Sequence, residues 1–165
     1  MPGFRQYCLD TSAYIRLHAE FPKAVYVDLW PRIEWLVKEH RFVSPLEVKR
    51  ELERNEGDKC CEWVKGRWDK LSDDDDAATV HTANTTPRIQ DMIRNGSRSS
   101  STRPWADPLV VALAYRKSIS VVTFESVTGG KNKIPRVCTD LRVECLTLTD
   151  LFCKEGWTFR IAKTG

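Results

Sequence analysis

The 165-residue sequence lacks several patterns that identify common classes of site and of membrane protein. Its six cysteines form no C-x-x-C pair and no Cys/His group with zinc-site spacing. Its three histidines, His18, His40 and His81, lie outside the acidic motifs described below, which argues against a Ser/His/Asp hydrolase. No apolar run approaches the roughly 20 residues of a membrane-spanning helix, and no signal-peptide-like segment precedes the first predicted strand. We therefore expect a cytoplasmic protein with reduced thiols, which does not act at a membrane.

The net charge is small, but charged residues are unevenly distributed along the chain. The formal net charge is only +3, yet between residues 94 and 136 basic residues outnumber acidic ones by eight to two. The two acids in that segment are Asp107 and Glu125. A basic segment with two isolated carboxylates suits a polyanionic substrate that binds with a metal ion, although a solubilising surface would give the same composition.

The length favours a single domain over residues 1–165. Short apolar runs predict strands, and helical spacing of apolar residues predicts helices between them. No internal repeat is present. The alternation of the two element types predicts an α/β fold with a mostly parallel central sheet. The predicted strands are 6–9, 41–43, 121–124 and 143–146, and the predicted helices are 11–17, 28–40, 44 onward, 58–71, one from a solvated acidic start at 73–76, 87–95, 107–117 and 149–153.

Capping residues predict the starts of several helices. Asp107 followed by Pro108 predicts an Asp cap with proline in the first helical position. Ser44 and Glu47 have the spacing of a capping box, and Thr149 is placed to cap the last helix. The capping box would give Glu47 a structural role. Glu51, one turn further along the same face, is then the better candidate for chemistry.

Four acids stand at positions suited to a common site. Asp10 ends the first strand, Glu51 lies one turn into a helix, Asp107 begins a helix, and Glu125 follows an interior strand. In open α/β sheets, ligands bind at the carboxyl ends of the strands. The sequence therefore predicts a site built from these four carboxylates.

The order of these motifs resembles the PIN-domain family, from about Tyr7 to about Phe159. One further run is similar to the VapC-like branch of short prokaryotic toxins and ribonucleases. The matching segments are Leu9-Asp10-Thr11-Ser12, Ser44-Pro45 through Val48-Lys49-Arg50-Glu51-Leu52, Ala106-Asp107 through Ala114, Val121 through Glu125 and, for the VapC-like branch, Lys133 through Cys138.

The resemblance implies a three-layer α/β/α fold and a Mg²⁺- or Mn²⁺-dependent endoribonuclease. It places Asp10, Glu51 and Asp107 around the metal with Glu125 as a fourth acid, and assigns a supporting hydroxyl to Thr11 or Ser12. Many PIN domains carry Asp where this chain has Glu125, so this longer side chain would reach the metal directly or through water.

The expected chemistry agrees with these residue types. Hard divalent cations prefer carboxylate oxygens, and a metal-activated water can attack phosphorus in line. Hydrolysis would leave a 5′-phosphate, and Trp105 is the tryptophan placed to stack a base. The candidate phosphate contacts are Arg98, Arg103, Lys131 and Lys133.

Two other functions remain open at this stage. A haloacid-dehalogenase-like phosphatase would require a second Asp two residues after Asp10, where this chain has Ser12. A catalytically inactive PIN-like module that binds RNA or protein would retain the fold without the reaction. For the nuclease, the resemblance implies an RNA substrate, a toxin-antitoxin role with a cognate antitoxin, and self-association as a homodimer.

Overall fold

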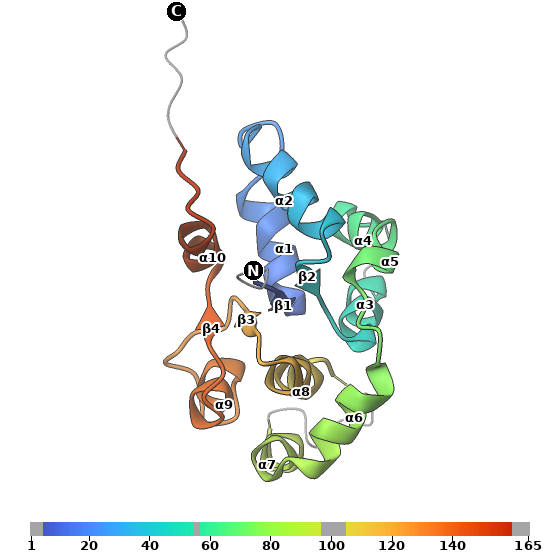
Figure 1. The fold of residues 1–165 in the computed structure, drawn as a ribbon, viewed down its shortest axis with the longest axis vertical. Helices are drawn as coiled ribbons and strands as arrows, with labels where there is room; N and C mark the ends of the chain where they lie inside the picture. Colours follow the sequence, from blue (N-terminus) through green and yellow to red (C-terminus); the bar gives the residue numbers. More distant parts are fainter. Residues whose placement is uncertain (1–4, 55–56, 97–104, 160–165) are drawn as a thin grey trace, which may run out of the picture.

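A four-stranded parallel sheet forms the centre of the computed structural model, which describes residues 5–54, 57–96 and 105–159 (Figure 1). The strands lie in the order β2-β1-β3-β4, and every neighbouring pair is parallel. Cys8 on β1 pairs with Val43 on one side and Val121 on the other. The predicted α/β class and parallel sheet are confirmed. The strands are β1 (Tyr7–Leu9), β2 (Phe42–Val43), β3 (Ser120–Val122) and β4 (Cys145–Leu146).

Helices cover both faces of the sheet, which gives three layers. In Figure 1, α1, α2 and α10 lie above the sheet, α8 and α9 lie below it, and α6 and α7 lie beyond α8. The helices are α1 (Thr11–Glu20), α2 (Leu29–Lys38), α3 (Leu46–Glu53), α4 (Lys59–Lys65), α5 (Trp68–Leu71), α6 (Asp76–Thr85), α7 (Pro87–Asn95), α8 (Asp107–Lys117), α9 (Ile134–Asp140) and α10 (Leu148–Lys154).

The helix α8 is buried because its middle is apolar on all sides. Residues 110–114 have no exposed surface, and the helix packs against β1, β3, α6 and α9. A helix that is apolar all round belongs in the interior. This burial fixes the start of α8, and with it Asp107, beside the ends of the inner strands.

One predicted helix is divided. The segment 58–71 forms α4 and α5 rather than a single helix, so that prediction was wrong. Gly66 is a poor helix former, and Arg67 leaves helical geometry at φ −122°. The Arg67 guanidinium donates to Glu34 and to the carbonyl oxygen of Trp63, and these bonds hold the break in place.

Two of the predicted caps are wrong. Ser44 does not cap α3, which begins at Leu46; its hydroxyl instead donates to the carbonyl oxygen of Leu9 at 2.7 Å. Glu47 is buried and paired with Arg50 and Arg54, so it has a structural role but not in a capping box. The cap of α10 is Thr147, which forms a capping box with Asp150; the prediction of Thr149 was wrong by two residues.

The start of α8 and the end of β3 also differ in detail. Ala106 is the residue before α8, so Asp107 is the first helical residue and makes no capping hydrogen bond. The strand β3 ends at Val122, two residues earlier than predicted. Thr123 and Phe124 therefore belong to the loop that leads to Glu125.

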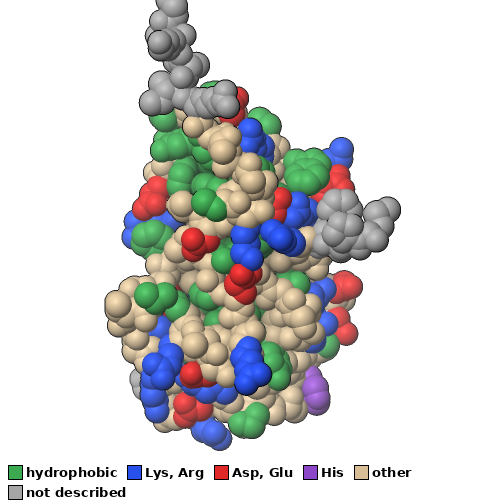
Figure 2. Space-filling model, turned by 60° about the vertical axis from the view of Figure 1, so that its left-hand side comes forward, with side chains coloured by type: hydrophobic (Ala, Val, Ile, Leu, Met, Phe, Trp, Pro, Cys, Tyr) green, Lys and Arg blue, Asp and Glu red, His purple; other side chains and the backbone are tan. Residues whose placement is uncertain are grey.

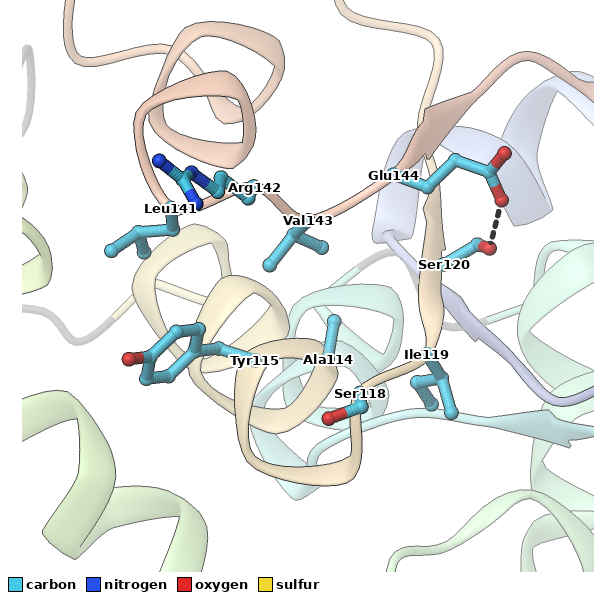
Figure 3. Close-up of a pocket in the computed structure, with 9 residues that line it drawn as sticks. All are labelled: Ala114, Tyr115, Ser118, Ile119, Ser120, Leu141, Arg142, Val143 and Glu144. Carbon is cyan, nitrogen blue, oxygen red and sulfur yellow. Dashed lines mark hydrogen bonds between the residues drawn. The ribbon is translucent and has the colours of Figure 1, made fainter.

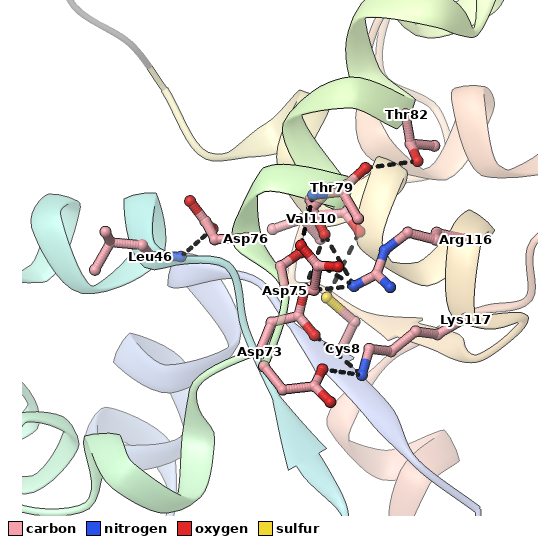
Figure 4. A network of polar contacts seen from close by, with 12 residues as sticks. Cys8, Leu46, Asp73, Asp75, Asp76, Thr79, Thr82, Val110, Arg116 and Lys117 are labelled. Carbon is pink, nitrogen blue, oxygen red and sulfur yellow. Dashed lines mark hydrogen bonds and ion pairs between the residues drawn. The ribbon is translucent and has the colours of Figure 1, made fainter.

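The acidic run at 73–76 is a helix start, as predicted, but it is not uniformly solvated (Figure 4). Asp75 accepts a hydrogen bond from the backbone of Ala78, which caps α6. The Asp73 side chain is only 1% exposed and pairs with Arg116 at 2.5 Å and Lys117 at 3.0 Å. The prediction of a solvated run was wrong for Asp73, because the end of α8 supplies two cations to it.

Folding thus neutralises part of the basic segment seen in the sequence. Besides Arg116 and Lys117, Arg136 pairs with Asp140 in the same helix. Positive and negative side chains accordingly lie side by side over the face shown in Figure 2.

Two further expectations concern cysteines and membranes. All six cysteines lie in the described residues and are free thiols, and Cys8, Cys60, Cys61 and Cys138 are buried, as expected for small apolar side chains. Among the described residues, no helix combines the length and apolar character needed to cross a bilayer.

Candidate functional site

The candidate site lies where β1 and β3 end. These strands are neighbours and parallel, so their carboxyl ends meet at one edge of the sheet. Asp10 follows β1, the segment 123–125 follows β3, and α8 begins nearby with Asp107. Glu51 joins them from α3, because its carboxylate accepts a hydrogen bond from the backbone N–H of Ala106 at 2.9 Å.

Asp10 is a buried carboxylate surrounded by donors. It is 3% exposed, and its Oδ1 accepts the backbone N–H of Thr11 at 2.7 Å. Its Oδ2 accepts the hydroxyls of Ser12 at 2.7 Å and Thr123 at 3.0 Å. Burial raises the pKa of Asp10, the hydrogen bonds of Ser12 and Thr123 oppose that rise, and the charge of Glu125 adds to it. The donors fix the orientation of the carboxylate.

Glu51 connects two helix starts. Its Oε2 accepts the hydroxyl of Thr11 at 2.7 Å, while its Oε1 accepts the N–H of Ala106. The two predicted supporting hydroxyls therefore divide between two acids: Thr11 holds Glu51 and Ser12 holds Asp10. This bridge ties the start of α1 to the start of α8.

Asp107 differs from the other acids because, within the described residues, no donor contacts its carboxylate. Burial, together with the negative charges of Asp10, Glu125 and Glu51, raises the pKa of Asp107 to about 8, against the opposing charge of Lys133. These charge effects indicate that Asp10, Glu51 and Glu125 all lie near Asp107. Without a cation, ionising Asp107 is costly.

Glu125 is held by the start of α9. Its Oε2 accepts the backbone N–H of Ile134 at 2.8 Å, and its Oε1 pairs with the Lys133 ammonium at 3.2 Å. The side chain is 19% exposed. Glu125 lies beside the other acids and anchors a helix at the same time.

The predicted phosphate contacts are only partly placed. Lys133 lies at the site through its pair with Glu125. Lys131 is exposed, and its backbone carbonyl accepts a hydrogen bond from Arg88. Arg98 and Arg103 lie outside the described residues. Trp105 is half-buried and lines an apolar cavity of about 230 Å³ with Ala83, Pro108 and others.

The residues have the oxygen donors that a hard cation prefers, but they are not arranged as a finished metal site. In residues 5–54, 57–96 and 105–159, no three or more His, Cys, Asp or Glu side chains stand together so that they could hold a metal ion. Oxygens of Asp10, Glu51 and Glu125 instead accept internal hydrogen bonds. The carboxylate of Asp107 would be the first available ligand, and a cation would offset the burial and the neighbouring negative charges that raise its pKa.

Sequence reasoning missed two residues at this edge. The Thr123 hydroxyl bonds Asp10 and also accepts the N–H of Glu125 at 3.1 Å. Phe124, the second missed residue, lies between Thr123 and Glu125 in the chain and is 46% exposed. A hydroxyl residue two positions before the strand-end acid was the available signal for Thr123.

A cavity of about 330 Å³ lies at the opposite end of the sheet (Figure 3). It is bounded by Tyr115 and Ser120 on one side and by residues 141–144 on the other, where Ser120 donates a hydrogen bond to Glu144. Ser120 begins β3 and Glu144 precedes β4, so this cavity is at the amino ends of the strands. None of the four predicted acids lines it.

Comparisons with known proteins identify a family without assigning a function. A search of curated proteins finds no match to this chain. Residues 7–159 match the family model described as a domain of unknown function, DUF4411. That match spans both inner strands and all four predicted acids. The chain therefore belongs to the DUF4411 family.

Proposed function

We propose that this protein is a Mg²⁺- or Mn²⁺-dependent endoribonuclease similar to PIN-domain nucleases. The observation that carries the proposal is the electrostatic state of Asp107. It shares one edge of the sheet with Asp10, Glu51 and Glu125, has no donor of its own among the described residues, and has a pKa raised to about 8. Such perturbed acids gather at functional sites.

The residues divide the work of such a site. Asp10 and Asp107 would hold the metal, and Glu51 would fix the distance between them by bridging Thr11 and Ala106. The bound metal would supply a nucleophilic water and neutralise charge on the phosphate. Ser12 and Thr123 would keep Asp10 oriented, since both donate to the same oxygen.

The ion pair between Glu125 and Lys133 would change when substrate binds. In the present pairing, Lys133 neutralises Glu125. An approaching phosphate would compete for the Lys133 ammonium and leave Glu125 to the metal or its water. Arg98, Arg103 and Lys131 remain further candidates for phosphate contacts.

Cleavage of labelled single-stranded RNA by the purified protein tests the proposal. We expect cleavage with Mn²⁺ or Mg²⁺, none in EDTA, and rates reduced by roughly two orders of magnitude or more in Asp10→Asn and Asp107→Asn. Asp74→Asn is the matched control, because Asp74 is an acid with an 87% exposed side chain paired with Lys117. Cleavage that survives both EDTA and Asp10→Asn would show that the metal mechanism is wrong.

The biological setting belongs to the same proposal. A VapC-like nuclease would act in the cytoplasm as a toxin, self-associate as a homodimer, and be inhibited by an antitoxin that covers the acids. Coexpression with the product of the neighbouring gene tests this: a small DNA-binding protein that copurifies and stops cleavage is the expected result, and cleavage unaffected by that product contradicts it.

One observation favours a second candidate, an inactive PIN-like module that binds RNA or protein. Within the described residues, no ready-made group of metal ligands is present, and oxygens of three acids already accept internal hydrogen bonds. RNA binding that is unaffected by Mn²⁺, together with a complete lack of cleavage, would favour this module over the nuclease.

A further inference from the structure

Phe124 is an exposed aromatic residue that precedes Glu125 in the chain and is linked to Asp10 through Ser12. Its backbone N–H donates to the Ser12 hydroxyl at 2.9 Å, and that hydroxyl donates to Asp10 at 2.7 Å. The residues on either side of Phe124 also belong to the site: Thr123 bonds Asp10 and Glu125 pairs with Lys133. The backbone at Phe124 is therefore held close to Asp10 by hydrogen bonds.

One face of the ring is already covered. The Arg16 guanidinium carbon lies 3.9 Å from the centre of the Phe124 ring, and Arg16 is held in turn by Glu20 at 3.1 Å. Arg16 lies one turn after Ser12 on α1, so both supports of Phe124 come from the same helix face. Because Phe124 is nevertheless 46% exposed, its open surface is the other face and the edge.

We propose that this open face of Phe124 is a stacking platform for one base of single-stranded RNA. This inference rests on the proposed nuclease function and deepens it. A phosphodiester at Asp10 and Asp107 is joined to its own base only through a ribose, and Phe124 is an exposed aromatic whose backbone the hydrogen bonds hold near Asp10. Arg16 packs against the other face of the ring and adds positive charge beside the platform.

A stacking platform at Phe124 selects unpaired nucleotides. Every base has a π-face, so stacking on Phe124 favours an unpaired nucleotide without strict base preference. A duplex hides its base faces within the stack, so it would gain nothing from the ring. The preferred substrate is then single-stranded RNA or an unpaired loop.

Binding measurements on the full-length chain test the platform. Fluorescence anisotropy measures binding of a short end-labelled single-stranded RNA to each Phe124 variant. One series is measured in Ca²⁺. A second series is measured in Mn²⁺ with the Asp10→Asn substitution also present. Phe124→Leu and Phe124→Ala should weaken binding at least about fivefold, the lower end of what losing a stacking aromatic costs, whereas Phe124→Trp should retain it. None of these variants should change binding of the duplex.

Tyr115→Ala is the matched control. Tyr115 is 43% exposed, close to Phe124 in exposure, but it lies at the opposite end of the sheet (Figure 3). Its removal should leave RNA binding unchanged. An equal loss in Tyr115→Ala and Phe124→Ala would overturn the proposal, because a loss shared by both sites does not require stacking at the acids.

The outcomes separate this inference from the nuclease itself. Cleavage by the wild-type protein, with Phe124→Leu and Phe124→Ala binding RNA normally, overturns the platform and leaves the nuclease intact. Binding that depends on Phe124 without any cleavage supports the platform and contradicts the nuclease. Absence of all RNA binding overturns the platform. A protein that binds no RNA at Phe124 but self-associates through this residue overturns it as well.

Discussion

Asp73, just before α6, and Asp107, at the start of α8, have opposite electrostatic states. At the start of α6, burial raises the pKa of Asp73, but Lys117 and the hydroxyl of Thr79 outweigh that effect and the pKa lies below its ordinary value. At the start of α8, burial and three neighbouring carboxylates raise the pKa of Asp107 to about 8. The two acids thus differ in whether a protein cation pairs with them directly.

The different pairing of Asp73 and Asp107 indicates different roles for the two regions. Asp73 joins the segment before α6 to the end of α8 through Arg116 and Lys117, so its charge is satisfied inside the fold (Figure 4). Asp107, at the other end of α8, is not satisfied by any donor among the described residues. A site that leaves a carboxylate in this state suits an external cation, whereas the Asp73 region suits stability.

The largest expected effect comes from breaking the Asp73 network. Asp73→Ala should lower the free energy of unfolding by about 2–3 kcal/mol, because it leaves Arg116 and Lys117 without their buried partner; their own partial exposure moderates the loss. Denaturant unfolding measures it. Asp74→Ala, at an 87% exposed side chain, should change stability by less than about 0.5 kcal/mol, and equal losses in the two variants would contradict the distinction.

The second effect is a pH dependence that arises at Asp107. Its folded pKa is about 8 and lies above its unfolded value, so the folded state binds more protons between about pH 4 and pH 8. Stability of the metal-free protein should therefore fall as pH rises through this window. Asp107→Asn should remove this dependence and stabilise the protein at pH 8 by on the order of 1 kcal/mol.

Thermal unfolding in EDTA at several pH values checks that expectation. Asp107→Asn should melt at a higher temperature than the wild type at pH 8, with a smaller difference at pH 5. Parallel curves for the two proteins across the whole range would contradict the assignment of the pH dependence to Asp107.

The smallest expected effect concerns Glu125. Glu125→Gln keeps an oxygen for the N–H of Ile134 and removes the charge that pairs with Lys133. Because Lys133 is 43% exposed, the loss of stability should be below about 1 kcal/mol. Denaturant unfolding of this variant without metal measures the loss, and a loss of several kcal/mol would show that Glu125 is chiefly structural.

Sequence patterns were sufficient where local physics decides the outcome. The apolar run of α8 predicted its burial, and β-branched residues before Glu125 predicted an inner strand, so the edge that carries Asp10 and Glu125 was foreseeable. Parallel pairing of β1 and β3 then brings those acids to one edge.

Partners distant in the sequence were not foreseeable. Asp73 meets cations 43 and 44 positions away, and Glu51 bonds the backbone of Ala106, 55 positions away. No periodicity encodes such pairs. The division of Thr11 and Ser12 between two acids, and the capture of Glu125 by α9, likewise depend on how helices pack around the sheet.

Calorimetric titration of Mn²⁺ into the wild-type protein and Asp107→Asn tests the central claim most directly. The account predicts Mn²⁺ binding with release of protons near pH 7, because the cation favours ionised Asp107, and binding weakened at least about tenfold in Asp107→Asn. Absence of binding to the wild type, or equal binding to both proteins, would contradict the claim that the acids at this edge of the sheet form a metal site.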